Sequence, residues 1–97
     1  MTKAIHLIAQ LRAKPGHEEA LGYFLTSVKS VLLREPGCRS VHLYRAEGKG
    51  KFFADEFWES REALDAHLKS PQFEETDAVF KTLLLHPVQI DIVDPID

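Results

Sequence analysis

The chain has 97 residues, of which 44% are hydrophobic and 28% charged, and this composition is typical of one ordinary globular domain. Its formal charge is −3, and acidic and basic residues are interspersed along the chain, so a basic stripe for a phosphate backbone is absent and no nucleic-acid partner is expected. A domain of this size buries a modest share of its surface, which favours a partner subunit as a source of further buried area.

Cysteine content and hydropathy bear on the compartment. Cys38 is the only cysteine, which excludes a disulfide within the chain and is typical of a reducing environment. The first residues lack the apolar run and small-residue cleavage site of a signal peptide. No stretch approaches the roughly 18 consecutive apolar residues that a membrane span requires. We therefore expect a cytoplasmic protein with no membrane partner.

Two elements of different period open the chain. Over residues 4–13 apolar and polar side chains alternate, which predicts a β-strand. Lys14-Pro15-Gly16 breaks this pattern. Over residues 17–34 the apolar side chains recur at helical spacing, which predicts a helix with one buried stripe. Glu35-Pro36-Gly37 is expected to end that helix.

The middle of the chain is predicted to form a β-hairpin. Residues 38–45 and residues 52–59 both return to short alternation. The turn signal Glu47-Gly48-Lys49-Gly50 stands between them. The two strands are therefore expected to pair antiparallel.

Two short helices and a last strand complete the chain. Ser60 is placed to cap a helix that runs through Leu68. Ser70-Pro71 can cap and start another helix that runs to about Leu85. Residues 88–93 alternate again and are expected to form the final strand.

The predicted order is β-α-β-β-α-β, with the second α element split in two. This is the order of a ferredoxin-like α+β fold, in which helices cover one face of an antiparallel sheet. One domain is expected over residues 1–97, with residues 93–97 as a loose tail. Both faces of the strands at 38–45 and 52–59 carry bulky side chains, so the face without helices needs a second layer. The sheet of a second subunit is the simplest cover, and we expect a homodimer.

Four motifs in register carry a resemblance to a known family. They are Glu35-Pro36-Gly37-Cys38, Glu56-Phe57-Trp58-Glu59, Ala63-Leu64-Asp65-Ala66-His67-Leu68 and Ser70-Pro71-Gln72-Phe73. Their order and nearly whole-chain extent resemble the antibiotic biosynthesis monooxygenase family. The resemblance implies a dimeric α/β barrel in which each subunit keeps a pocket between its sheet and its helices.

The resemblance leaves several activities open. Members of the family oxidise phenolic or quinol-type aromatics with molecular oxygen and without metal or flavin, others isomerise a small phosphorylated sugar-like compound, and a related branch degrades haem. Gln72 stands where the family often has a histidine, which removes one acid/base group. The places that correspond to the haem-degrading residues hold Ala9 or Gln10, His67 and Asp77, which disfavours haem degradation.

His67 is the candidate catalytic residue. Helical spacing places it beside Leu68 and one turn after Ala63 and Leu64, so an imidazole lies on an otherwise apolar face. One interpretation is a half-buried histidine whose polar atoms are satisfied by a backbone carbonyl. The other, which the resemblance favours, is a general base that takes a phenolic proton near neutral pH.

The remaining candidates are assigned to a substrate pocket. Trp58 is either core packing or a flat wall for an aromatic substrate, and Glu56 on the same strand face either anchors a substrate hydroxyl or forms a salt bridge. Asp77 shares a helix face with Phe73 and either faces the pocket or lies on its rim. Two more candidates, which line the pocket or fill the barrel of the dimer, are His42 and Tyr44.

Three functions are weighed. The first is a cofactor-independent monooxygenase that acts on a small aromatic or quinol-type substrate, with His67 as the base. The second is an isomerase of a small phosphorylated carbonyl compound, for which Arg12, Arg39 and Arg45 are the candidate phosphate-binding groups. The third is a dimeric barrel that binds a small ligand without turnover. No metal site is expected, because the histidines lack the short paired spacing of a zinc or iron site.

Overall fold

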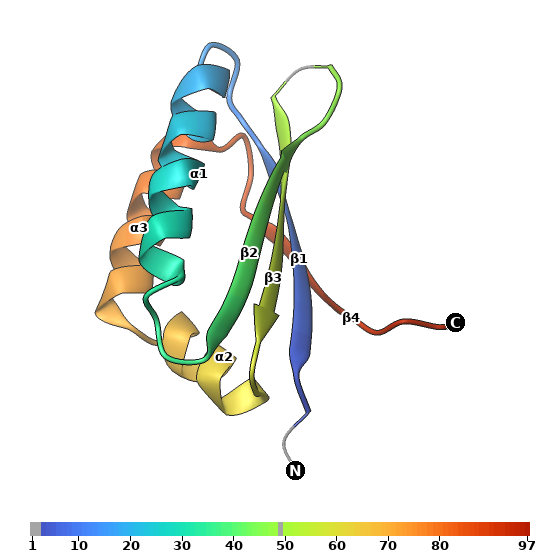
Figure 1. Cartoon of the computed structure of the whole chain (residues 1–97). Helices are drawn as coiled ribbons and strands as arrows, with labels where there is room; N and C mark the ends of the chain where they lie inside the picture. The colour runs from blue at the N-terminus through green and yellow to red at the C-terminus, as the bar shows by residue number, and fades with distance from the viewer. Residues whose placement is uncertain (1–2, 49) are drawn as a thin grey trace.

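The computed structural model of the protein describes residues 3–48 and 50–97. Its helices and strands follow the predicted order along the chain (Figure 1). In chain order they are β1 (Ile5–Arg12), α1 (Glu18–Leu32), β2 (Cys38–Arg45), β3 (Lys51–Trp58), α2 (Arg61–Leu68), α3 (Pro71–Leu83) and β4 (Gln89–Val93).

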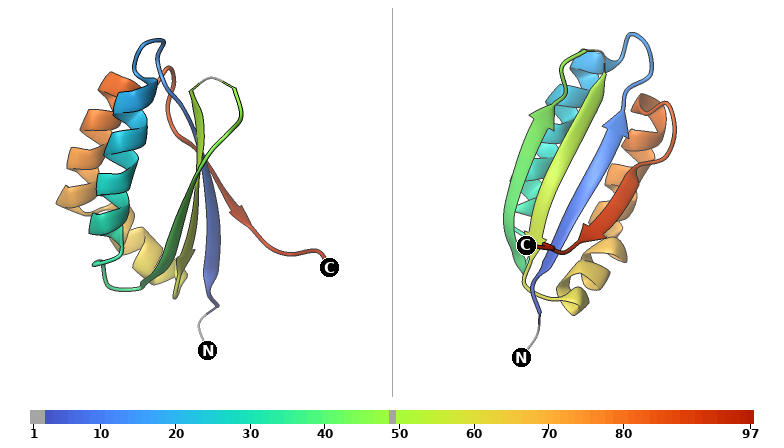
Figure 2. Two further views of the ribbon diagram at one scale, coloured as in Figure 1. Left: turned by 45° about the horizontal axis from the view of Figure 1, so that its top comes forward. Right: turned by 90° about the vertical axis from the view of Figure 1, so that its right-hand side faces the viewer.

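The strands form one antiparallel sheet in the order β2-β3-β1-β4. α1 and α3 lie side by side over one face of this sheet, and the short α2 packs near the end of β3 (Figure 1). The other face is turned away from all three helices (Figure 2). The predicted ferredoxin-like α+β fold is therefore confirmed.

The last helix is shorter than the sequence predicts. α3 ends at Leu83 and not at about Leu85, because Leu84 adopts an extended backbone with φ −95° and ψ 143°. The Leu83 carbonyl accepts a hydrogen bond from the Lys14 amide at 2.9 Å, and the Leu85 amide donates to the Arg12 carbonyl at 2.8 Å. The chain after α3 thus extends the sheet at the end of β1.

The predicted hairpin joins β2 to β3. Its turn signal contains Lys49, which lies outside the described residues. The Ala46 amide donates to the Lys51 carbonyl at 2.9 Å, so the two strands are closed at this end by a backbone hydrogen bond.

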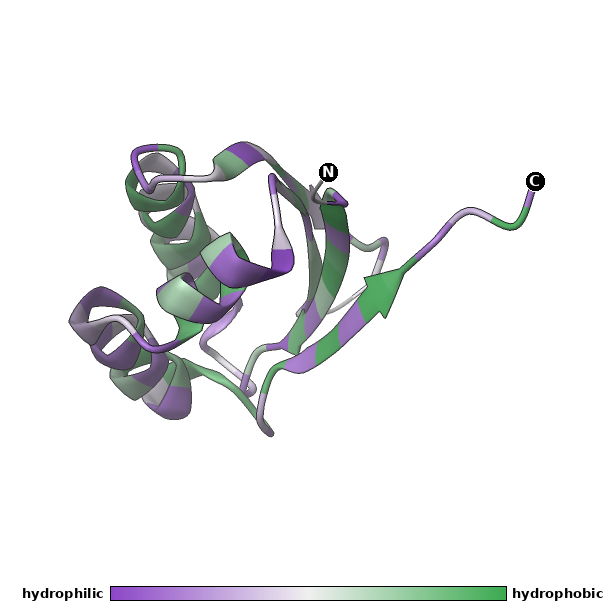
Figure 3. Ribbon diagram, turned by 90° about the horizontal axis from the view of Figure 1, so that it is seen from below, coloured by the Kyte–Doolittle hydropathy of each residue, from purple (hydrophilic) through white to green (hydrophobic). Residues whose placement is uncertain are grey.

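Alternation along the strands builds the core on the helix side of the sheet. Leu7, Ala9 and Leu11 point from β1 toward the helices and are buried. Trp58 of β3 and Leu21 of α1 are among the largest fully buried side chains. The strands accordingly show alternating hydrophobic and hydrophilic bands (Figure 3).

The open face carries a mixed surface. His6, Ile8 and Phe57 are half-buried there, and Tyr44 is 53% exposed. Residues 94–97 run outward on this side of the sheet (Figure 2). Within residues 3–48 and 50–97, each helix falls short of the length and apolar character needed to cross a membrane.

Candidate active site

A cavity of about 260 Å³ lies between the covered face of the sheet and the helices. Most of its lining is apolar and comes from β1, β2, β3, α1 and α3. Few polar groups interrupt these walls, which is the usual construction of a small-molecule site. The polar and charged lining residues are Lys29, Glu35, Glu56, His67, Gln72, Thr76 and Asp77.

Glu35 reaches the cavity through the turn that follows α1. Gly37 has φ 87°, a backbone conformation that favours glycine, and a Cβ at this position would collide with the Cβ of Ala63 on α2. The Gly37 carbonyl also accepts a hydrogen bond from the Glu59 amide at 2.8 Å. The turn is therefore held against the end of β3 and against α2, which places Glu35 opposite His67.

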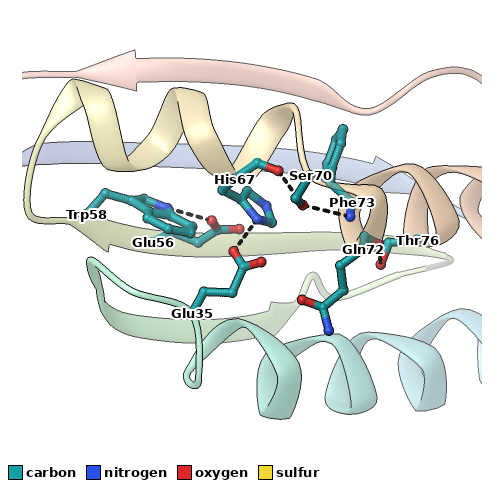
Figure 4. Close-up of polar contacts among 8 residues, drawn as sticks. All are labelled: Glu35, Glu56, Trp58, His67, Ser70, Gln72, Phe73 and Thr76. Atoms are coloured by element: carbon teal, nitrogen blue, oxygen red, sulfur yellow. Dashed lines mark hydrogen bonds and ion pairs between the residues drawn. The ribbon is translucent and has the colours of Figure 1, made fainter.

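His67 is the centre of the polar cluster (Figure 4). Its Nδ1 contacts the Glu35 carboxylate, and the two side chains are only 11% and 12% exposed. Neither Nδ1 nor the facing Glu35 oxygen has another polar partner among the described residues. Because a carboxylate only accepts hydrogen bonds, Nδ1 carries the proton in the neutral imidazole and Nε2 keeps its lone pair.

Two aromatic rings hold the imidazole in place. Trp58 stacks on it with ring centroids 4.8 Å apart and 26° between the planes. Phe73 meets it edge to face at 5.2 Å and 69°. Trp58 is fully buried and forms the wall behind His67, whereas Phe73 lines the cavity itself.

Glu56 lies at the N–H edge of the same indole. The Trp58 Nε1–H donates to Glu56 Oε1 at 3.0 Å. Burial raises the pKa of Glu56, the Trp58 hydrogen bond and His67 partly offset this, and nearby carboxylates such as Glu35 add to it. The indole therefore fixes both groups, with His67 on its face and Glu56 at its N–H edge.

Serine caps position the helices that carry His67 and Phe73. The Ser60 side chain accepts a hydrogen bond from the Ala63 amide at 3.1 Å, which starts α2. Ser70 Oγ accepts from the Phe73 amide at 3.1 Å and donates to the His67 carbonyl at 2.7 Å (Figure 4). Ser70 therefore starts α3 and also ties it to the end of α2. Both predicted caps are confirmed.

The structure places four of the predicted site residues on the cavity: His67, Glu56, Phe73 and Asp77. Asp77 lies on the rim, since its side chain is 43% exposed and pairs with Lys81 at 3.5 Å. Trp58 contacts His67 but does not itself line the cavity.

His42 and Tyr44 lie on the opposite side of the sheet. In the β2–β3 register they pair with Asp55 and Phe53, whereas the cavity-lining Val41 pairs with Glu56. His42 and Tyr44 therefore do not line this cavity, and their other predicted place, in the barrel of a dimer, stays a prediction. Strand alternation puts them on the open face, where only a second layer could enclose them.

Glu35 is the site residue that sequence reasoning missed. It appeared only as part of the Glu35-Pro36-Gly37 helix stop and of the first family motif. An ionisable side chain beside a turn glycine was the available signal, but it does not say which residue the carboxylate meets.

Cys38 and the arrangement of metal-binding side chains bear on two other chemistries. Burial, followed by the charges of Glu56 and Glu35, raises the pKa of Cys38 to about 11, so its thiol stays protonated near neutral pH and is a poor nucleophile. In the part of the chain that the structure describes, no three His, Cys, Asp or Glu side chains are grouped to hold a metal ion.

Comparison with known proteins places this geometry in context. Residues 4–79 match the family described as antibiotic biosynthesis monooxygenase. The chain is 33% identical over 97 residues to Rv0793 of Mycobacterium tuberculosis, which is named as a candidate monooxygenase, and the match covers 100% of this chain and 96% of that protein. The solved structure of Rv0793 superposes with a TM-score of 0.86, covering 98% of this chain and 97% of that chain. The structure of PA3566 from Pseudomonas aeruginosa gives a TM-score of 0.86 at 28% identity, covering 100% and 98% of the two chains.

Proposed function

This chain belongs to the antibiotic biosynthesis monooxygenase family, and we propose that it is a monooxygenase that oxidises a small quinol-type aromatic with molecular oxygen. One observation carries the proposal. His67, whose Nδ1 faces Glu35, lines a mostly apolar cavity together with the aromatic ring of Phe73. A proton acceptor in an apolar cavity with an aromatic wall suits the activation of a phenolic hydroxyl.

The chemistry starts with proton transfer. His67 Nε2 takes the proton of a bound aromatic hydroxyl, and Glu35 stabilises the imidazolium that results. The phenolate is electron-rich and reduces oxygen itself, so in this proposal the substrate supplies every electron and no cofactor is needed. A dihydroxy-aromatic and O₂ give a hydroxyquinone and water: one oxygen atom enters a C–H bond, and the other leaves as water with the two hydrogens that the diol loses. His67 returns its proton to the reduced oxygen.

A second copy of the chain belongs to the same proposal. Ile8, Phe53 and Phe57 are only half-buried on the open face, and Tyr44 there is more than half exposed. A facing sheet would remove this apolar area from water. Analytical ultracentrifugation is expected to give the mass of a dimer, and a monomer at all concentrations would contradict this part of the proposal.

The activity is tested by oxygen uptake with a panel of dihydroxy-aromatic compounds. The wild-type protein is expected to consume oxygen, and His67→Ala is expected to lower the rate by about 10²–10⁴-fold, the usual contribution of a general base. His6→Ala is the matched control, because His6 is also paired with a carboxylate but lies on the open face. No uptake with any compound, or equal losses in both variants, would contradict the proposal.

The isomerase alternative finds less support at this cavity. Arg12, Arg39 and Arg45 do not line it, and Lys29 is the one basic side chain among its lining residues apart from His67. Inorganic phosphate that protects the protein against thermal unfolding would favour this alternative. A hit from a small-molecule panel that binds unchanged would favour the binding module.

A further inference from the structure

The charged groups of the cavity are unevenly distributed. Glu35, Glu56 and Asp77 are acidic, whereas Lys29 is the one Lys or Arg in the lining. With each acid counted as ionised, three acids face two cations even if His67 is protonated. The lining therefore has an excess of negative charge in either state of the imidazole.

Glu56 differs from the other two acids. Glu35 pairs with His67, and Asp77 pairs with Lys81 at the rim. Glu56 forms no ion pair within the described residues, and its one side-chain hydrogen bond comes from Trp58. Burial also raises its pKa, because the ionised carboxylate loses hydration there. A hydrogen bond from a ligand would compensate for part of that loss.

The hydrogen-bonding character of the site follows from the same geometry. Oε1 of Glu56 is occupied by the indole N–H, which leaves Oε2 as an acceptor, and the neutral His67 offers Nε2 as a second acceptor. Both groups are fixed against the same ring of Trp58 (Figure 4). A ligand hydroxyl group can donate to either acceptor, whereas an ether or a quinone carbonyl can donate to neither.

We infer that Glu56 makes this cavity selective for uncharged aromatic molecules that donate hydrogen bonds, and that it excludes anionic aromatics such as carboxylates and phosphates. A ligand carboxylate would bring a like charge into a poorly solvated space beside Glu56. Lys29 cannot neutralise both. The inference rests on the proposed function for the aromatic scaffold of the ligand and adds the rule by which the site chooses among such scaffolds.

Three naphthalenes of matched shape test the rule. They are 1,4-dihydroxynaphthalene, 1,4-dihydroxy-2-naphthoate and 1,4-dimethoxynaphthalene, titrated without oxygen at pH 7 by equilibrium dialysis. The diol is expected to bind about tenfold or more tightly than either of the others. In Glu56→Gln the naphthoate is expected to come within about threefold of the diol, because the repelling charge is gone while the side-chain carbonyl still accepts the Trp58 N–H.

Asp65→Asn is the control. It removes one negative charge from α2 at an exposed pair with Arg61 outside the cavity lining, so the ratio of diol to naphthoate affinity is expected to stay within about twofold of wild type. The inference is overturned if the naphthoate binds as tightly as the diol, as an anchor at Lys29 would produce, if the diol does not bind, or if Glu56→Gln leaves the ratio unchanged.

Oxygen uptake with the same diol separates this inference from the proposed function. Selective binding without oxygen uptake would support the selectivity of the cavity and contradict the proposed monooxygenase activity. Oxygen uptake without selective binding would support the activity and contradict the selectivity.

Discussion

The two faces of the sheet carry the same small motif in different surroundings. On the covered face His67 pairs with Glu35 and stacks on Trp58 at 4.8 Å. On the open face His6 pairs with Asp55 and stacks on Phe57 at 4.1 Å. The first pair is 11% and 12% exposed, whereas the second is 28% and 26% exposed.

The comparison shows that a histidine–carboxylate pair is not by itself a site. His67 uses Nδ1 for its carboxylate and keeps Nε2 for a ligand, whereas His6 uses Nε2 for Asp55. The covered pair also lines a mostly apolar cavity, where charges interact more strongly than at a solvated surface. The two pairs therefore differ in which ring nitrogen is left over, in burial, and in the apolar cavity that His67 lines, and not in their residue types.

Replacing the aromatic ring that stacks on each histidine with alanine should give the largest difference in stability between the two faces. Trp58→Ala is expected to lower the free energy of unfolding by about 3–5 kcal/mol, because it empties a fully buried position. Phe57→Ala on the same strand should cost less in the single chain. Chemical denaturation at several protein concentrations measures both.

Chemical denaturation at several protein concentrations also tests whether the chain forms a dimer. The Trp58→Ala loss should be the same at every concentration, whereas Phe57→Ala should weaken the concentration dependence of the wild-type midpoint if a second copy covers its face. Equal losses for both variants would show that the two faces are buried alike.

Neutralising the carboxylates should separate the faces in catalysis. Glu35→Gln is expected to lower kcat about 10–100-fold, less than removal of the base itself, with KM changed little. The amide can either accept from Nδ1 or donate to it, so the tautomer that leaves Nε2 free is no longer fixed. Nitrogen-15 NMR of His67 should report a mixture of tautomers in the variant.

Asp55→Asn is the matched change on the open face. It should leave kcat within about twofold of wild type, since this pair lies on the face of the sheet away from the cavity. A comparable loss in both variants would place the effect of Glu35 in general stability and not in the orientation of His67.

Much of the fold followed from local signals. Strand alternation, the helical stripe of α1 and the two serine caps each depend on residues within a few positions of one another, and they led to the right elements in the right order. The end of α3 was missed because the chain near Leu84 pairs with Ala13 at the end of β1, a contact between segments far apart in the sequence.

The site was harder for a similar reason. Alternation put His42 and Tyr44 on one face of β2, but it could not say which face the helices cover, because Phe52 and Phe53 are equally bulky on the two faces of β3. Glu35 meets His67 only because Gly37 lets the turn close on α2. The sequence shows which ionisable side chains are available, but tertiary packing decides which of them come into contact.

The smallest expected effect concerns two adjacent carboxylates of β3 that point to opposite faces. The pKa of Glu56 is raised in the folded protein by burial, so between its unfolded and folded values the native state binds more protons and stability falls as pH rises. Glu56→Gln removes this loss and is expected to stabilise the protein by about 0.5–2 kcal/mol at pH 7 and by less at pH 4, where the unfolded carboxyl is also largely protonated. Thermal unfolding of wild type, Glu56→Gln and Asp55→Asn at both pH values measures it, because about 1 kcal/mol moves Tm by about 4–8 °C in a domain of this size. If Glu56→Gln is less stable than wild type at pH 7, the attraction between the Glu56 carboxylate and His67 stabilises the fold by more than the loss of hydration destabilises it. In that case the buried carboxylate would not need a hydrogen bond from a ligand at Oε2.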